Sequence, residues 1–222
     1  RQSDLLKKDL TPKLAESGVV LHAWTELPPS TQAELARHFD EQIFPVLTPL
    51  TVDPAHPFPY ISNLSLNLAL MVRDRETGVH RFARVKVPPL LSRFLSCGGP
   101  GELIPVEQVI AAHAPILFPG ADILSCHAFR VTRDADLAIE ESDVDDKLLA
   151  VVSALQRRLR TNDAVRVEIQ AGLSDEAKDL LAAELELEPA DLYATDAPLD
   201  LGALWAIYGV DRPDLKHLLF SP

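Results

Sequence analysis

FPVLTPLTVDPAHPFPYISNLSLNLAL, residues 44–70, is the stretch that decides the fold predicted for this chain. Five prolines lie within its first sixteen residues: Pro45, Pro49, Pro54, Pro57 and Pro59. Proline fixes its own φ and moves the preceding residue out of the helical region, so this part cannot form a regular helix. We expect a stiff, extended connector. Because a stiff segment loses little conformational entropy on ordering, it can hold one surface geometry with few tertiary contacts, which suits docking as well as chemistry.

On the carboxyl side of the connector, alternating residues predict a β-hairpin. Residues 65–73 alternate as a strand does, and residues 81–87 place Ala83, Val85 and Val87 on one face and Phe82, Arg84 and Lys86 on the other. The Arg-Glu-Thr-Gly sequence between them is typical of a hairpin turn. The same alternation returns at residues 128–132 and 165–170, where further strands are expected.

Apolar stripes at helical spacing predict the helices. Residues 29–43 place Leu35, Phe39 and Ile43 on one stripe, after an apolar strand at residues 19–24. Further helices are expected at residues 105–113, from Ser174 as N-cap, at residues 200–208, and, as the longest, from Ser142 within the acidic run 140–146. Hairpins mixed with strand-helix units predict an α+β fold, with a mixed, largely antiparallel sheet and packed helices.

The amino-terminal residues predict the end of a helical domain that precedes this fold. Leu5, Leu6, Leu10 and Leu14 recur at near-helical spacing, and Gly18 supplies a C-cap. We therefore predict three parts: residues 1–18 as the end of an amino-terminal helical domain, residues 19–210 as the main domain, and residues 211–222 as a linker. The unfinished helix and tail favour a fragment of a longer protein.

Three blocks of the sequence carry a family resemblance. They are PVLTPLTVDPAHPFPYISNLSLNLAL (45–70), RFARVKVPPLLSRF (81–94) and FRVTRDADL (129–137). In this order and at about this spacing, they resemble the middle, or head, region of the long, multi-domain polyphosphate kinases. The likeness covers nearly the whole chain from about Val19 onward. No segment resembles the carboxy-terminal half of that family, whose histidines carry its chemistry.

The resemblance implies a function for the parent enzyme rather than for this part alone. The family transfers the terminal phosphate of ATP reversibly to inorganic polyphosphate through a phosphohistidine, with Mg²⁺. This chain would then be a non-catalytic head domain that serves subunit and domain contacts and the wall of the active-site tunnel, with no catalytic, cofactor-binding or metal-binding residue of its own. Its implied partners are the rest of its own polypeptide, further copies of the parent in a homo-oligomer, and polyphosphate through the parent.

Charge and composition narrow the choice of partner and compartment. The chain has 33 acidic and 21 basic side chains, and its net charge of -12 argues against nucleic acid as the main ligand. Cys97 and Cys126 show neither a CxxC spacing nor a set of histidine partners, so a zinc site is not expected, whereas a disulfide stays open. The apolar stretches are too short to span a bilayer. We expect a soluble, cytoplasmic protein with no transmembrane segment.

The connector contains the candidate docking residues Asp53, His56, Phe58 and Tyr60. An acid and an imidazole three residues apart could orient a general base or bind a metal, but no third partner is evident. Asp before proline more commonly caps a turn. We therefore predict a rigid docking ridge with apolar tips at Phe58 and Tyr60, and not a catalytic base at His56.

Basic side chains are the candidate contacts for a polyanion. A groove that binds polyphosphate needs lysine or arginine, and the candidates are Arg81, Arg84, Lys86 and Arg93, with Arg130 and Arg133 as a second pair. The ordinary alternative is that these cations form the exposed face of a half-buried hairpin.

Two rival functions stay open at this stage. One is a free-standing α+β protein-interaction domain, and the other is a small hydrolase that uses Asp53 and His56. The sequence contains no GxxxxGK or GxGxxG phosphate loop, no HExxH pair and no GxSxG elbow. A self-contained nucleotide or hydrolase site therefore has little support.

Overall fold

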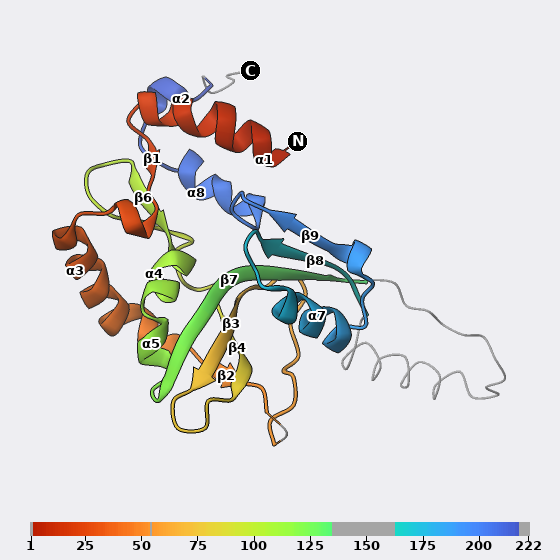
Figure 1. The fold of residues 1–222 in the computed structure, drawn as a ribbon. Helices are drawn as coiled ribbons and strands as arrows, with labels where there is room; N and C mark the ends of the chain where they lie inside the picture. Colours follow the sequence, from red (N-terminus) through yellow and green to blue (C-terminus); the bar gives the residue numbers. More distant parts are fainter. Residues whose placement is uncertain (1, 54, 135–162, 218–222) are drawn as a thin grey trace, which may run out of the picture.

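The predicted hairpin forms the centre of a six-stranded sheet in the computed structural model, which describes residues 2–53, 55–134 and 163–217 (Figure 1). The sheet has the order β2-β4-β3-β7-β8-β9. Its strands are β2 (Pro49–Thr51), β3 (Leu66–Asp74), β4 (His80–Lys86), β7 (Ala121–Arg133), β8 (Ala164–Gln170) and β9 (Leu192–Thr195). Neighbours pair antiparallel except β8 and β9, which are parallel. The predicted α+β class with a mixed, largely antiparallel sheet is therefore confirmed.

The β3–β4 turn is held by the side chain that precedes it. Asp74 Oδ1 accepts hydrogen bonds from the backbone N–H groups of Glu76 (3.0 Å) and Thr77 (2.8 Å). Gly78 follows with a φ of +72°, a conformation that glycine adopts without a steric cost. The predicted turn is confirmed, and its acceptor is an aspartate, one of the residues that favour such turns.

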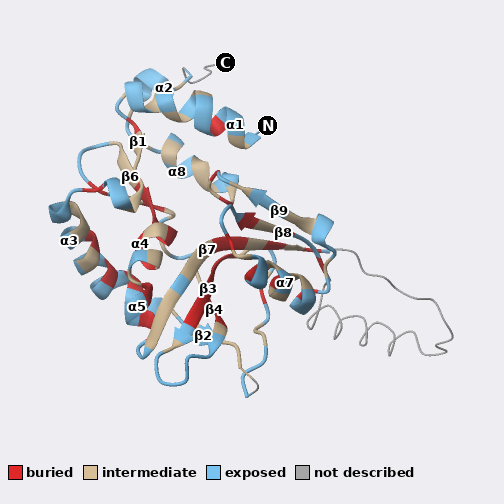
Figure 2. Ribbon diagram, in the orientation of Figure 1, coloured by how far each residue is buried: buried red, intermediate tan, exposed pale blue. Residues whose placement is uncertain are grey.

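Both faces of the sheet are buried along most of β3 and β4, and Figure 2 shows β3 largely in red, whereas much of β7 is tan. On one face, Leu68, Leu70 and Val85 pack with the buried residues of α3 (Pro29–His38), α4 (Val106–Ala112) and α5 (Ala114–Leu117). On the other face, Met71, Phe82 and Phe129 pack with α7 (Asp175–Glu184). The alternative in which the hairpin cations form an exposed face is therefore wrong for Arg84, which is buried because α7 and the connector cover this face.

A small second sheet packs beside the helices. It has the order β1-β6-β5, formed by β1 (Val20–Leu21), β6 (Glu102–Pro105) and β5 (Phe94–Ser96). β1 runs parallel to β6, and β5 runs antiparallel to it. The strand expected at residues 19–24 is thus shorter than predicted, and a 3-10 turn (Trp24–Glu26) follows it.

The connector is less uniform than its prolines suggest. The predicted stripe of Leu35, Phe39 and Ile43 is buried, and the helix continues after α3 as a π-helical turn (Phe39–Ile43) and a 3-10 turn (Phe44–Val46). Proline is tolerated at position 45 because the backbone N–H groups at the start of a helical turn have no partner within that turn. Beyond it the chain is extended, and it contributes the edge strand β2, which was not predicted.

The amino-terminal helix ends as predicted. Helical residues run through α1 (Gln2–Leu5), a π-helical turn (Leu6–Leu10) and α2 (Thr11–Glu16). Gly18 has a φ of +82°, and the N–H groups of Gly18 and Val19 donate to the carbonyls of Ala15 (2.9 Å) and Leu14 (2.8 Å). These two bonds form a Schellman motif, which satisfies carbonyls that the helix end leaves open.

Both ends of the described chain lie together (Figure 1). Ser3 Oγ lies 2.7 Å from Thr195 Oγ1, Lys7 pairs with Asp196 at 3.6 Å, and the Arg212 guanidinium donates to the Ser17 carbonyl. The segment that makes these contacts continues from β9 through a 3-10 turn (Leu201–Leu204), α8 (Trp205–Tyr208) and another 3-10 turn (Pro213–Leu215). The division into residues 1–18, 19–210 and 211–222 stays a prediction.

Three further predictions concern the carboxy-terminal half. Ser174 caps α7 as expected, because its Oγ accepts from the Ala177 N–H at 3.3 Å. The predicted alternation at residues 165–170 places Val165 on the same face as Val167 and Ile169, and this is wrong. Val165 is exposed because a bulge shifts the register between β7 and β8 at this point. The predicted long helix from Ser142, with its acidic run, lies outside the described residues.

Candidate functional site

Asp53 and His56 form one compact turn in the connector. Asp53 Oδ1 accepts from the N–H groups of Ala55 (2.8 Å) and His56 (2.9 Å), and the backbones of Asp53 and His56 exchange two further hydrogen bonds. The His56 ring completes the turn, with Nδ1 lying 3.1 Å from Asp53 Oδ1 and 3.2 Å from Oδ2. Asp53 therefore caps a turn, as the dipeptide with proline suggested, and it also holds the imidazole.

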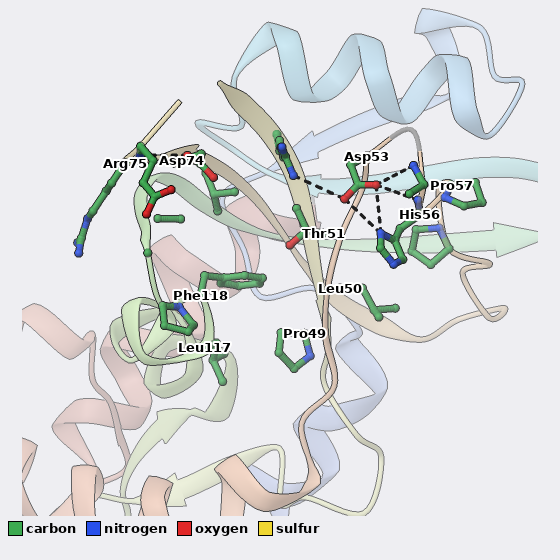
Figure 3. Close-up of a pocket in the computed structure, with 18 residues that line it drawn as sticks. Pro49, Leu50, Thr51, Asp53, His56, Pro57, Asp74, Arg75, Leu117 and Phe118 are labelled. Atoms are coloured by element: carbon green, nitrogen blue, oxygen red, sulfur yellow. Dashed lines mark hydrogen bonds and ion pairs between the residues drawn. The ribbon is translucent and has the colours of Figure 1, made fainter. Parts of the chain in front are cut away.

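This turn borders an open pocket of about 1090 Å³, shown in Figure 3. The pocket lies between the connector, the β3–β4 turn and the loop before β7. Arg81 reaches in from β4 and lies 3.5 Å from Asp53 Oδ2. The polar lining is mixed in sign: Asp53, His56, Asp74, Arg75, Glu76 and Arg81. A pocket with this lining is not a strong polyanion site, because its carboxylates offset its cations.

The Asp53–His56 pair does not form a complete catalytic group. Hydrogen bonds, first from the Ala55 N–H and then from the His56 ring, hold the pKa of the Asp53 carboxyl below its ordinary value. The His56 side chain is 76% exposed, and among the described residues its ring makes hydrogen bonds to Asp53 alone. A nucleophile activated by His56 would have to lie within hydrogen-bond reach, so this turn fits a structural or docking role better than a hydrolase.

The other two docking candidates differ from each other. Phe58 is half-buried and packs on Phe82, with ring centroids 5.6 Å apart, so it belongs to the core rather than to an apolar tip. Tyr60 is 54% exposed, with the Arg133 guanidinium 4.4 Å from its ring centroid. The docking role of Asp53, His56, Phe58 and Tyr60 stays a prediction, and Phe58 also contributes to intrachain packing.

The basic candidates on β4 do not share one groove. Arg81 lines the pocket beside Asp53, whereas Arg84 is buried on the α7 side and its Nε donates to Asn67 Oδ1 at 2.8 Å. Burial lowers the pKa of the Arg84 guanidinium. Lys86 lies at the end of the strand, with Nζ 3.4 Å from Ser62 Oγ. Arg81 and Lys86 are the candidates on this strand that keep partial exposure.

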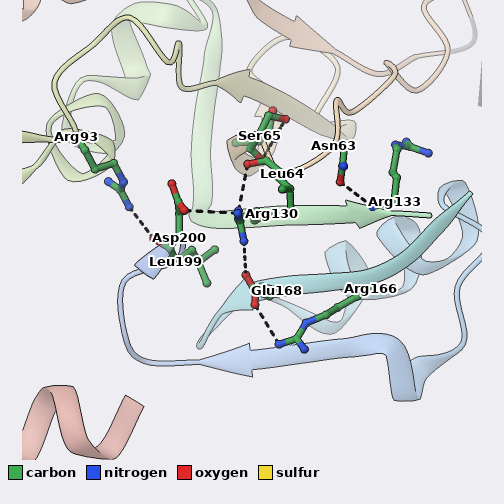
Figure 4. Close-up of polar contacts among 11 residues, drawn as sticks. Asn63, Leu64, Ser65, Arg93, Arg130, Arg133, Arg166, Glu168, Leu199 and Asp200 are labelled. Carbon is green, nitrogen blue, oxygen red and sulfur yellow. Dashed lines mark hydrogen bonds and ion pairs between the residues drawn. The ribbon is translucent and has the colours of Figure 1, made fainter. Parts of the chain in front are cut away.

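Arg130 is the centre of the polar network in Figure 4. Its Nε donates to the Leu64 carbonyl at 3.1 Å, and its two terminal nitrogens lie 3.4 Å from Glu168 Oε2 and 3.5 Å from Asp200 Oδ1. The side chain is 18% exposed. One guanidinium therefore joins the connector, β8 and the segment that leads into α8.

Arg93, the residue before β5, anchors the same segment. It donates to the Leu199 carbonyl at 3.3 Å and forms an ion pair with Glu107 of α4. Burial lowers its pKa to about 10, and the nearby Asp200 carboxylate opposes that shift. Asp200 itself has a φ of +59°, which is strained for a residue with a side chain. Arg93, directly before β5, and Arg130 of β7 thus hold residues 199–200.

Arg133 fastens the connector to the far end of β7. Its Nε donates to the Ile61 carbonyl at 2.7 Å, and its backbone N–H donates to Asn63 Oδ1 at 2.9 Å. The role of the six basic residues in polyanion contact stays a prediction. The structure shows Arg84, Arg93, Arg130 and Arg133 in internal contacts.

Sequence reasoning missed the carboxylates of this network, Glu107, Glu168 and Asp200. Arg130 and Asp200 are 70 residues apart, and neither lies in a motif that would link them. The signal that could have located Glu168 is its position opposite Arg130 in the β7–β8 register, which requires the strand pairing to be known.

The two cysteines are free thiols, and the pKa of each is raised. Both are free, so the disulfide left open by the sequence does not form in this structure. Burial raises the pKa of the Cys126 thiol to about 12 and also raises that of Cys97. Neither thiol has the lowered pKa that is typical of an activated cysteine nucleophile.

Comparison with known proteins gives three findings. A family model described as the polyphosphate kinase middle domain matches residues 30–207. The polyphosphate kinase of Streptomyces coelicolor is 51% identical over 220 residues, which cover 99% of this chain and 29% of that protein. The polyphosphate kinase of Mycobacterium leprae is 44% identical over 237 residues, which cover 100% of this chain and 32% of that protein.

A solved structure shows the same fold. The crystal structure of polyphosphate kinase from Porphyromonas gingivalis aligns with a TM-score of 0.75 and 21% sequence identity, over 99% of this chain and 32% of that one. The chain thus spans about a third of the length of the relatives it matches.

Proposed function

Because this chain belongs to the polyphosphate kinase family, we propose that it is the non-catalytic head domain of an enzyme that reversibly transfers the terminal phosphate of ATP to inorganic polyphosphate. The observation that carries the proposal is the match of residues 30–207 to the family's middle domain. The parent enzyme would use ATP, Mg²⁺ and a phosphohistidine. We assign all three to the part of the enzyme outside this chain, and we propose a cytoplasmic homo-oligomer.

The surroundings of three of the histidines, His22, His56 and His113, support a head domain without a phosphohistidine. All seven histidines lie in the described residues. His56 is bound to the Asp53 carboxylate, and His22 lies 3.9 Å from Glu102. His113 Nδ1 donates to the Val109 carbonyl at 2.8 Å, and the His113 ring stacks on Phe39 with ring centroids 4.4 Å apart. The carboxylates beside His22 and His56 repel an incoming phosphate group. The stacked ring of His113 faces the core, where a phosphate group would have to displace Phe39.

The described residues do not fit a resident Mg²⁺ site. Within them, no group of three or more His, Cys, Asp or Glu side chains comes together as metal ligands would. The same part of the chain contains no helix long and apolar enough to cross a membrane.

The internal contacts of the arginines support a scaffold role for this domain. Arg93, Arg130 and Arg133 join the connector, the two sheets and the segment before α8. A domain braced in this way can hold a fixed surface toward other domains or subunits. For the proposed tunnel wall, the supporting side chains are Arg81 and Lys86, because they keep partial exposure.

A comparison of this chain with the longer polypeptide tests the proposal. Given ATP, Mg²⁺ and polyphosphate, the 222-residue chain should neither extend the polymer nor acquire acid-labile phosphate, whereas the longer polypeptide should do both. His56→Ala is the control variant, because it removes the histidine of the only acid-imidazole turn in the connector. Acid-labile phosphate on the 222-residue chain that His56→Ala, or a single His→Ala change at one of the other six histidines, removes would contradict a non-catalytic head.

A further inference from the structure

An exposed apolar stripe runs along the segment that ends in α8. Leu201, Trp205 and Tyr208 are spaced i, i+4 and i+7, and they are 39%, 75% and 52% exposed. The Trp205 and Tyr208 rings contact edge to face, with centroids 5.5 Å apart. Leu201 lies in the 3-10 turn and the two rings lie in α8, so the three exposed apolar side chains share one short helical segment, and exposed apolar patches of this kind mark contact sites. An indole with three quarters of its surface in water is unusual, because tryptophan is normally highly buried.

The stripe is not on a loose tail. Just before it, Ala197 and Leu199 are buried, the Leu199 carbonyl accepts from Arg93, and the Asp200 carboxylate pairs with Arg130 (Figure 4). The Ala203 N–H donates to the Asp200 carbonyl at 3.0 Å, which starts the helical turns directly from that anchor. The two arginines therefore fix the position of the stripe.

The other end of the segment is also held. The Arg212 guanidinium donates to the Ser17 carbonyl at the end of α2 and pairs with Asp214 at 2.7 Å. Lys216 Nζ lies 5.3 Å from the Tyr208 ring centroid. A helix that is fixed at both ends and still faces water presents a pre-organised surface, which reduces the entropy cost of binding.

We propose that the stripe of Leu201, Trp205 and Tyr208 docks into an apolar groove on a part of the same polypeptide outside residues 1–222. This inference rests on the proposed function, in which the chain is one domain of a longer enzyme. About two thirds of each matched relative lies outside the match, which supplies the length for such a groove. A groove tethered to the same chain has a high effective concentration at the stripe, which favours it over a second copy.

Tryptophan fluorescence tests the inference directly, because Trp24 and Trp205 are the two tryptophans in the sequence. Trp24→Phe leaves Trp205 as the sole reporter and keeps an aromatic ring at position 24. In that background, acrylamide should quench Trp205 freely in the 222-residue chain and severalfold less in the longer polypeptide. Trp205→Phe is the matched control, since Trp24 should be quenched equally in both proteins.

Two outcomes would overturn the proposal. In the first, Trp205 is quenched equally in the short and the long protein. In the second, Trp205 becomes protected in the 222-residue chain as its concentration rises, which would assign the stripe to a contact between copies. Protection in the longer polypeptide that does not depend on concentration supports the tethered groove.

A pair of variants separates docking from folding. In the longer polypeptide, Trp205→Ala with Tyr208→Ala should raise the rate of limited proteolysis severalfold, whereas Leu90→Ala, at a residue that is 73% exposed, should not. Equal rates for both variants would contradict docking. Phosphotransfer by the unmodified longer polypeptide is measured separately: an inactive enzyme with Trp205 protected would refute the proposed function and leave the docking intact.

Discussion

Replacing Arg130 by alanine should destabilise the protein more than the same replacement of an exposed arginine, because the Arg130 side chain joins three segments. The change removes one hydrogen bond to the Leu64 carbonyl and two ion pairs, with Glu168 and Asp200. Losing a partly buried hydrogen bond costs about 1 kcal/mol, and each partly exposed ion pair adds about 0.5 kcal/mol. We therefore expect a loss of about 2 kcal/mol in the free energy of unfolding.

Arg166→Ala is the matched control for this loss. Arg166 shares the Glu168 partner at 3.0 Å and stacks on Tyr193, but its side chain is 44% exposed and makes no contact with residues 199–200 among its described partners. Its removal should cost about 0.5 kcal/mol, since exposed ion pairs contribute little. Urea unfolding followed by circular dichroism measures both variants, and the midpoint should shift without a change in slope.

A double-mutant cycle with Asp200→Asn isolates the central contact. Asparagine tolerates the left-handed backbone at position 200 and removes only the charge. The coupling between Arg130→Ala and Asp200→Asn should be about 0.5 kcal/mol, given side chains that are 18% and 37% exposed. A loss for Arg130→Ala no larger than that for Arg166→Ala, or a coupling of zero, would refute the role assigned to Arg130.

Four further predictions follow from single side chains. Leu6→Glu should lower the free energy of unfolding by about 3 kcal/mol, because Leu6 is buried, whereas Leu5→Glu at an exposed position should change it little; equal urea midpoints would contradict this. Asp53 has a folded pKa below its ordinary value of 3.8, mainly because the backbone N–H group two residues on donates to it. Its contribution to stability is therefore present above that pH and is lost as the pH falls through the lower folded pKa, so Asp53→Asn should flatten the acid side of the stability curve. His56→Ala should lower turnover of the longer polypeptide only mildly, and a loss of about a thousandfold would indicate a catalytic base. Cys126 should react slowly with iodoacetamide in the folded protein at neutral pH and quickly in urea, because burial raises its pKa to about 12.

The features that the sequence predicted correctly depend on neighbouring residues. The β3–β4 hairpin follows from strand alternation and a turn with Asp74 before it, and the helix end at Gly18 follows from a local left-handed glycine. Ser174 caps α7 for the same kind of reason, since the N-cap bond spans three residues. The sequence also showed the family resemblance, because that resemblance rests on runs of adjacent residues. The family model and the relatives confirm the family.

The features that the sequence did not reveal depend on residues that are far apart in it. Alternation within β4 could not show that this face is covered over Phe82 and Arg84, because the covering side chains belong to α7 and to the connector, which are separate from β4 in the sequence. The exposure of Val165 required the bulged register between β7 and β8.

The sequence by itself determined the local elements and the family of this protein. The tertiary structure decided which charges meet. Arg130, Glu168 and Asp200 come from separate segments, and the strand pairing and the return of the chain after β9 bring them together. Because ion pairs and docking surfaces depend on distances between such segments, the roles of Arg130 and of the stripe at Trp205 became visible only in the folded chain.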